Sequence, residues 1–265
     1  MTQIRILDDK RTILFIVLCS IFLTNAIIAE LIGIKIFSAE SVLGLSPANI
    51  QLLDGFVLDF NLTAGVVVWP IVFITTDIIN EYYGKDGVKK ISYITVIFIA
   101  YIFVVIYLVT ILPPAEFWLQ VNKEDVQGNF FDMAFAFRKI FRQGMGIIVG
   151  SLIAFLVSQL LDVYVFHKLR KITGSKNLWL RATGSTLVSQ LIDSFVVLAI
   201  AFYIFGDWSI AQVISVGIIN YLYKFGAAVL LTPVLYIAHF VIDSYLGKNT
   251  ATMMMAEASR DTTFA

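Results

Sequence analysis

The chain has 265 residues, of which 59% are hydrophobic and only 14% are charged, and its formal net charge is zero. Soluble domains carry about 25% charged residues, so this composition excludes an ordinary soluble domain and indicates a membrane protein. Its single cysteine, Cys19, excludes an intrachain disulfide and a thiolate metal site.

Six segments are long and apolar enough to cross a hydrocarbon core, which needs about 20 mostly apolar residues. They lie at roughly 12–36, 63–82, 91–112, 144–166, 183–205 and 210–241. The first run is longer than the apolar core of a signal peptide, about 7–15 residues, so we expect it to remain as a spanning helix. We expect Pro70 to kink the second segment, because proline removes a helix hydrogen bond.

Two long loops and a tail accompany the spans. The first loop, 38–62, contains a short hairpin around LLDGFVLDF, and the second, 113–143, ends in FFDMAFAFRKIF, whose helical spacing suits a membrane interface. The sequence thus predicts a single six-helix transmembrane domain over 1–246. The polar residues 247–265 predict a flexible cytoplasmic tail.

The distribution of positive charge predicts the orientation. With both termini on one side, 13 Lys and Arg residues lie on that side and four in the opposite loops, and Lys35 and Lys224 fall within spans. Lys and Arg are enriched in cytoplasmic loops. We therefore expect an all-α membrane protein with six transmembrane helices and both termini in the cytoplasm.

A polar pattern occurs twice inside apolar runs, in FLVSQLLD and in TLVSQLID. The two copies consist of Ser158, Gln159 and Asp162, and of Ser189, Gln190 and Asp193. Spacings of three and four residues place each set on one face of its helix. The linker between them is short, so the helices should be antiparallel neighbours with both glutamines at similar depth. Two such polar faces are a common way to line a substrate site.

Other polar residues also lie at membrane depth, where an ionisable group costs about 2.5–3.5 kcal/mol on insertion scales. Lys224 lies near the middle of the last span and needs a carboxylate partner. Single Ser, Gln or Asn residues often only join helices by hydrogen bonds, whereas clustered charges favour a cavity. Glu81 is expected at the interface, and neither His167 nor His239 is assigned a metal. The candidate substrate-binding residues are Asn25, Glu30, Asp77, Gln159, Asp162, Ser189, Gln190, Asp193, Asn220 and Lys224.

Several stretches resemble the queuosine precursor transporters, a six-span bacterial family of vitamin-uptake-like proteins. They include TTDIINEYYG (75–84), LWLR (178–181), NYLYKF (220–225) and the doubled S-Q-L-x-D, and the resemblance runs over about 12–241. Gly146 departs from it, because some relatives have a basic residue there; Arg142, one turn away, could substitute. The motif positions present are Asp77, Asn80, Glu81, Gln159, Asp162, Trp179, Ser185, Thr186, Gln190, Asp193 and Lys224.

The resemblance implies a multi-pass transporter of the bacterial inner membrane rather than an enzyme. It would import a 7-deazaguanine base, 7-cyano-7-deazaguanine above all, for the tRNA nucleoside queuosine. The residues agree, because a carboxylate can accept both the ring N–H and the exocyclic amine of such a base. Phe155, Tyr221 and Tyr223 are candidates for stacking on it. One central lysine among several carboxylates disfavours an anionic substrate, and no Gly-rich phosphate loop occurs.

Two alternatives remain open on the sequence. The chain could be the substrate-binding subunit of an energy-coupling-factor vitamin importer, with Ala26, Ala29 and Gly33 docking the coupling module. It could also be an intramembrane enzyme that uses Asp162 and Asp193 as a pair. We expect a small-molecule substrate and the lipid bilayer as partners, and neither nucleic acid, metal nor cofactor. A homodimer, the mode of energy coupling and the preferred deazaguanine stay open.

Overall fold

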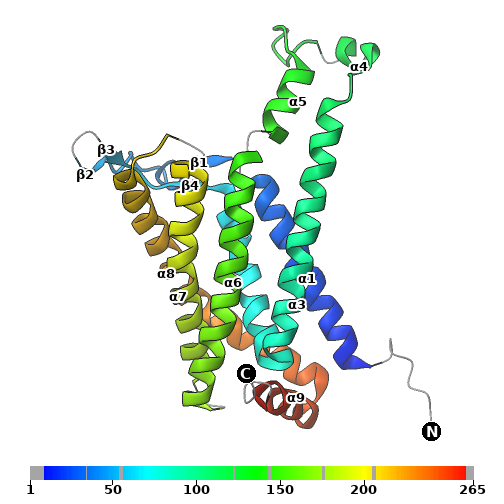
Figure 1. Ribbon diagram of the computed structural model, residues 1–265, viewed down its shortest axis with the longest axis vertical. Helices are drawn as coiled ribbons and strands as arrows, with labels where there is room; N and C mark the ends of the chain where they lie inside the picture. Colours follow the sequence, from blue (N-terminus) through cyan, green and yellow to red (C-terminus); the bar gives the residue numbers. More distant parts are fainter. Residues whose placement is uncertain are drawn as a thin grey trace.

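The protein is described here by a computed structural model, covering residues 9–33, 35–53, 56–121, 123–142, 145–174, 177–204 and 207–260. The described residues include five helices long and apolar enough to cross a membrane. They are α1 (Lys10–Ile32), α3 (Trp69–Ile111), α6 (Met145–Thr173), α7 (Leu178–Leu198) with its π-helical continuation η3 (Ala199–Ile204), and α8 (Ile210–Leu246). The predicted all-α membrane fold is therefore confirmed (Figure 1).

Five helices account for six predicted segments because α3 contains two of them. Gly84 interrupts α3 with a non-helical backbone, φ 68° and ψ −172°. At this point the chain reverses, so that the two arms of α3 run in opposite directions (Figure 1). Glycine adopts this left-handed conformation without the steric cost that a Cβ would add.

The kink predicted at Pro70 is wrong. Pro70 lies in the first turn of α3, where the missing N–H would have no helical partner and proline is favoured. The predicted second span also begins too early, since Asn61–Thr63 form strand β4 and Ala64–Val67 form the 3₁₀ turn η2.

The first long loop folds into two small antiparallel sheets at one end of the bundle. Strand β1 (Ile36–Ser38) pairs with β4, and β2 (Ile50–Leu53) pairs with β3 (Phe56–Leu58), which confirms the predicted hairpin. The short helix α2 (Ala39–Val42) follows β1. Its Glu40 carboxylate accepts hydrogen bonds from Ser38 Oγ at 2.9 Å and from Phe60 N–H at 2.7 Å. The Phe60 N–H is the main cause of the lowered pKa of Glu40.

The second loop contains α4 (Glu116–Val121) and α5 (Met133–Arg142), so the predicted helix at its end is confirmed. Arg142 Nε donates to Thr110 Oγ1 at 2.7 Å, and its guanidinium lies 5.2 Å from the Tyr107 ring centre. These contacts join α5 to the end of α3.

Residues 248–260 differ from the expected flexible tail. Lys248–Arg260 form helix α9, whose Ala251 and Met254 are buried in the main hydrophobic core. Arg170 donates to the Met255 carbonyl oxygen at 2.6 Å, which fastens α9 to α6. The polar composition of this segment hides the apolar positions Ala251, Met254 and Ala258, which are buried. Helix α9 lies at the end of the bundle where α1 begins, opposite the β-strands (Figure 1).

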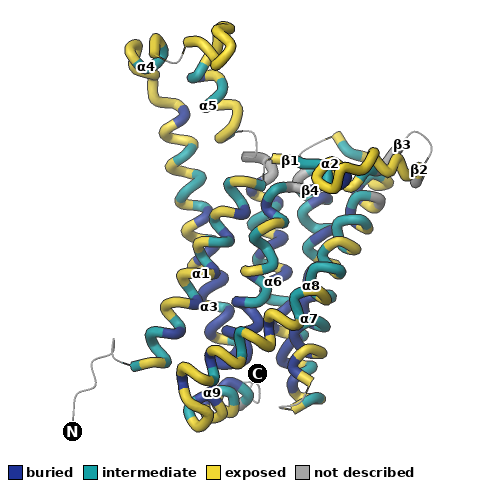
Figure 2. The backbone as a smooth tube through the Cα atoms, turned by 180° about the vertical axis from the view of Figure 1, so that it is seen from behind, coloured by how far each residue is buried: buried dark blue, intermediate teal, exposed yellow. Residues whose placement is uncertain are grey.

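The buried residues gather toward this α9 end, around α1, α3 and α6, whereas the arm of α3 that leads to α4 is largely exposed (Figure 2). Many exposed side chains of the long helices are large and apolar, as Val104, Leu108 and Leu230 are. Such surfaces are rare on soluble proteins and suit contact with lipid.

Candidate substrate site

The polar faces of α6 and α7 meet, together with the first arm of α3, around a small cavity that we call the glutamine cavity. This arrangement follows from the antiparallel packing of α6 against α7. The glutamine cavity is lined by Phe73, Thr76, Ser158, Gln159, Asp162, Thr186, Ser189 and Gln190. Five of the six residues of the duplicated pattern therefore share one cavity, and both glutamines lie on it.

Hydroxyl groups surround one oxygen of the Asp162 carboxylate. Ser189 Oγ lies 3.2 Å from Asp162 Oδ1, within hydrogen-bond distance, and also 3.1 Å from the Thr186 carbonyl oxygen. The side chains of Ser185 and Thr186 interact with the same carboxylate. These donors hold Asp162 in a fixed orientation at the cavity.

Three buried oxygen atoms of this cavity have no hydrogen-bond partner: Asp162 Oδ2, Gln159 Oε1 and Gln190 Oε1. Buried polar atoms are nearly always paired, and leaving one unpaired costs about 1–3 kcal/mol. A ligand that brings several N–H donors would satisfy all three oxygens.

The glutamine cavity is too narrow for a base in this state. The space between its side chains amounts to about 210 Å³, most of it in gaps narrower than a water molecule, with room for about one water. The helices must therefore separate before a base-sized ligand can enter.

A second cavity, which we call the Asp77 cavity, lies beside the first between α3, α7 and α8. It surrounds about 300 Å³ of empty space. Asp77 Oδ1 is buried there without a hydrogen-bond partner, and the hydroxyls of Thr183 and Thr232 lie 3.2 Å apart. The lining residues are Phe73, Ile74, Asp77, Ala182, Thr183, Thr186, Ala228, Leu231, Thr232 and Leu235.

The other five candidate residues line neither cavity. Asp193 of α7 forms an ion pair with Lys224 of α8, each side chain being 18% exposed. Glu30 accepts a hydrogen bond from Ser151 Oγ at 2.7 Å, which joins α1 to α6. Asn25 donates to the Ile21 carbonyl oxygen of its own helix at 2.8 Å. Asn220 is half-buried on α8.

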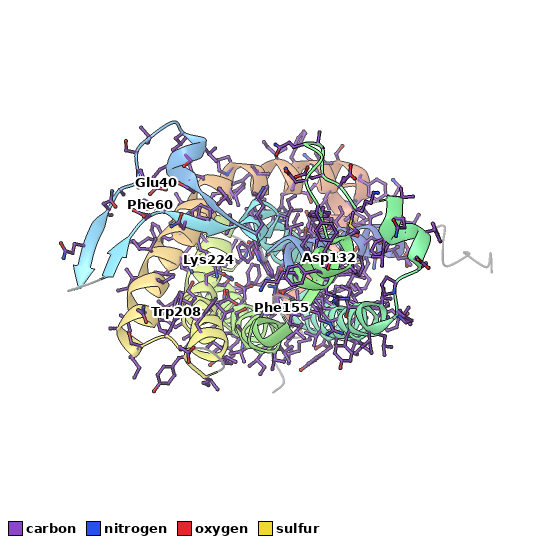
Figure 3. All side chains as sticks on the ribbon, turned by 90° about the horizontal axis from the view of Figure 1, so that it is seen from above. Glu40, Phe60, Asp132, Phe155, Trp208 and Lys224 are labelled. Carbon is purple, nitrogen blue, oxygen red and sulfur yellow. The ribbon has the colours of Figure 1, made fainter. Side chains whose placement is uncertain are left out.

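The aromatic residue on both cavities is Phe73, which was not among the stacking candidates. Its ring stacks on Trp69 at 5.9 Å, and Trp69 in turn contacts Phe155 at 5.9 Å. Seen from above, Lys224 and Phe155 lie within the outline of the bundle, whereas Glu40 and Phe60 lie out over the first loop (Figure 3). Phe155 extends the aromatic row of Phe73 and Trp69 through its contact with Trp69.

Sequence reasoning missed a buried ion cluster between the cavities and α9. Arg181 donates to both Glu81 oxygens, at 3.0 and 2.7 Å, and each side chain is only 2% exposed. Arg170 lies 3.5 Å from Glu81 and donates to the Asn80 and Glu81 carbonyl oxygens. The signal was present, since Glu81 stands in the T-D-x-x-N-E motif and Arg181 in L-W-L-R. Glu81 was expected at the membrane interface without a partner inside the protein; its side chain is instead buried and paired with Arg181.

Comparison with known proteins agrees with this membrane fold. The chain matches a family described as "Putative vitamin uptake transporter" over residues 63–238. It is 33% identical over 198 residues to a "Probable queuosine precursor transporter" of Bacillus subtilis (strain 168), covering 74% of this chain and 80% of the relative.

Two further relatives carry similar names. A "Probable queuosine precursor transporter" of Haemophilus influenzae is 31% identical over 65% of this chain and 66% of its own length. A "Queuosine precursor transporter" of Escherichia coli (strain K12) is 26% identical over 63% and 68%, respectively. No solved structure matches the chain.

Proposed function

The chain belongs to the queuosine precursor transporter family, and from that premise we propose that it imports a 7-deazaguanine base across the bacterial inner membrane. It is a multi-pass membrane transporter and not an enzyme. The expected cargo is 7-cyano-7-deazaguanine, and the proposed site that captures it is the glutamine cavity.

One observation carries this proposal: three buried acceptor oxygens without partners converge on the glutamine cavity. A deazaguanine presents a ring N–H, an exocyclic amine and a pyrrole N–H along its edges. The Asp162 carboxylate suits the adjacent ring N–H and amine, because charge-assisted paired hydrogen bonds are the strong ones. The two glutamine amides have both donor and acceptor atoms for the remaining edge.

Transport requires the cavity to open alternately to each side of the membrane. Helices α6 and α7 carry most of the glutamine cavity, and α3 and α8 complete the two cavities. Rocking of one pair of helices against the other, as in many secondary transporters, would admit the base from outside and release it inside. The neutral base needs no lysine, which agrees with Lys224 being occupied by Asp193.

The test is uptake of radiolabelled 7-cyano-7-deazaguanine by cells that cannot synthesise deazaguanines. We expect uptake that depends on this protein, and we expect Gln190→Met to reduce it about tenfold, because one hydrogen bond to the base is worth about 1 kcal/mol or more. The matched control is Leu191→Met, because Leu191 is the next residue and is 40% exposed on the lipid side.

Unlabelled guanine as a competitor measures how strongly the nitrile-bearing ring is preferred. Repeating the assay in cells without any coupling-factor ATPase tests the energy-coupling-factor alternative. Absence of uptake by the unaltered protein would refute the proposed function, and normal uptake by Gln190→Met would refute the site alone.

A further inference from the structure

The glutamine cavity and the Asp77 cavity share a wall. Phe73 of α3 and Thr186 of α7 line both cavities, and no other residue is common to the two linings. The two spaces are therefore neighbours, separated by one aromatic ring and one threonine side chain.

The order of the two cavities along the bundle follows from the direction of the helices. Helix α7 begins near the α9 end, and its residues Ala182 and Thr183 line the Asp77 cavity, whereas Ser189 and Gln190 line the glutamine cavity. With the shared Thr186 counted in both sets, their centres are about five residues apart, or about 7 Å along the helix. The Asp77 cavity is thus the nearer of the two to α9.

The first arm of α3 gives the same order. This arm runs toward Gly84 and α9, and Asp77 lies one turn beyond Phe73 in that direction. Positive charges also gather at this end, where α1 begins and α9 lies. The α9 end is the side on which imported cargo would be released.

Both cavities offer related chemistry. Each contains a buried aspartate oxygen without a hydrogen-bond partner, Oδ2 of Asp162 in one and Oδ1 of Asp77 in the other. Each contains threonine hydroxyls, and each is bounded by the flat Phe73 ring. A base that leaves one carboxylate can thus be accepted by the next while it remains against the same aromatic surface.

We propose that the two cavities are successive binding stations for one base. The base binds first in the glutamine cavity, passes the partition formed by Phe73 and Thr186, and occupies the Asp77 cavity before its release at the α9 end. This inference rests on the proposed function. It assigns Asp77 to passage and release, and Asp162, Gln159 and Gln190 to the first capture of the base.

The experiment compares binding with translocation in the purified full-length protein. Equilibrium binding of radiolabelled 7-cyano-7-deazaguanine is measured in detergent, and exchange of the same base across the membrane is measured in proteoliposomes. Ala228→Leu fills the Asp77 cavity, because Ala228 lines that cavity and not the other. We expect binding within threefold of the unaltered protein and exchange at least tenfold slower.

Val229→Leu is the matched control, since Val229 is the adjacent residue and is 48% exposed away from the core; it should change neither quantity. The second variant is Asp77→Asn, which is nearly isosteric, so its effect does not depend on how well a leucine fits the cavity. It should likewise keep binding within threefold of the unaltered protein and slow exchange at least tenfold. Loss of binding together with exchange in both folded variants would show a single station and overturn the inference. Normal exchange in either variant would also overturn it, whereas an unaltered protein that neither binds nor exchanges the base would refute the proposed function itself.

Discussion

Four carboxylates inside this bundle fall into two groups. Asp193 with Lys224, and Glu81 with Arg181 and Arg170, are compensated by ion pairs. Asp77 and Asp162 instead keep an oxygen atom without a hydrogen-bond partner, and both of these oxygens lie on cavities. The first group joins helices, and the second group is available to a ligand.

The Asp193–Lys224 pair is predicted to hold α7 against α8 rather than to touch the base. Removal of one partner leaves a partly buried charge uncompensated, which is strongly destabilising in a dry site and less so here, where each side chain is 18% exposed. We expect Asp193→Asn and Lys224→Ala each to reduce uptake at least tenfold while the protein still inserts into the membrane.

The exchanged double variant, Asp193→Lys with Lys224→Asp, restores the pair and should recover part of the uptake. Uptake by each variant is divided by its amount in the membrane, measured on immunoblots. A double variant no better than the two single variants would mean that Asp193 or Lys224 acts on the base directly.

The sequence predicted some of the buried polar residues and missed others. The duplicated pattern predicted most of the glutamine cavity, because spacings of three and four residues place Gln159 beside Asp162. The same spacing placed Asp193 beside Gln190, but Asp193 pairs with Lys224 and does not line the cavity. The sequence did not predict the Glu81–Arg181 pair, since the expected span began at 183 and left Arg181 in a loop, whereas α7 begins at Leu178. The expected boundary lay five residues too late, and this placed a buried cation in a loop.

For helix α3, the apolar composition predicted two spanning segments but not the position at which the chain turns between them. The two apolar segments within it were both predicted, but the kink was assigned to Pro70 instead of Gly84. Proline in a first turn is compatible with a helix, whereas a left-handed glycine can reverse the chain. A single sequence gives no measure of φ, so the position of the reversal could not be predicted from it.

Gly84 is expected to tolerate no side chain. Its φ is +68°, and an added Cβ would lie 3.2 Å from the Ala258 carbonyl oxygen of α9. The left-handed conformation alone costs about 1–2 kcal/mol for a residue with a Cβ, and the contact with α9 adds to it. We therefore predict that Gly84→Ala lowers the melting temperature of the purified protein by several degrees.

Two other glycines serve as controls for this substitution. Gly128 has φ +82° with nothing within 4 Å, so Gly128→Ala reports the backbone cost alone. Gly226 has open space and an ordinary helical backbone, so Gly226→Ala should be neutral or slightly stabilising. Equal melting temperatures for Gly84→Ala and Gly128→Ala would show that α9 does not pack on Gly84 in the membrane protein.

At the scale of the whole molecule, α1 begins and α9 lies at the same end of the bundle (Figure 1). The sequence predicted this arrangement from charge alone, and an even number of crossings agrees with it. The first arm of α3, from Trp69 to the break at Gly84, is about 22 Å long at 1.5 Å per residue. This is shorter than a hydrocarbon core of about 30 Å, so the strands and η2 would have to complete that crossing.

We predict that the end carrying α9 faces the cytoplasm. Alkaline phosphatase fused after Arg260 should then be inactive, and the same enzyme inserted between α4 and α5, near Gln127, should be active. Green fluorescent protein at the two positions should give the reverse pattern. Active phosphatase at the C-terminal position would contradict the orientation and the six crossings proposed with it.

Helix α9 packs on Gly84, and this contact can form only late in biosynthesis. The turn between the two arms of α3 leaves the ribosome long before residues 248–260 are made, yet its backbone is covered by Ala258 and its carbonyl oxygens are joined to α9 through Arg170. Assembly at this end must therefore wait until residues 248–260 have been made. A nascent chain halted before α9 would expose that turn to proteolysis and quality control.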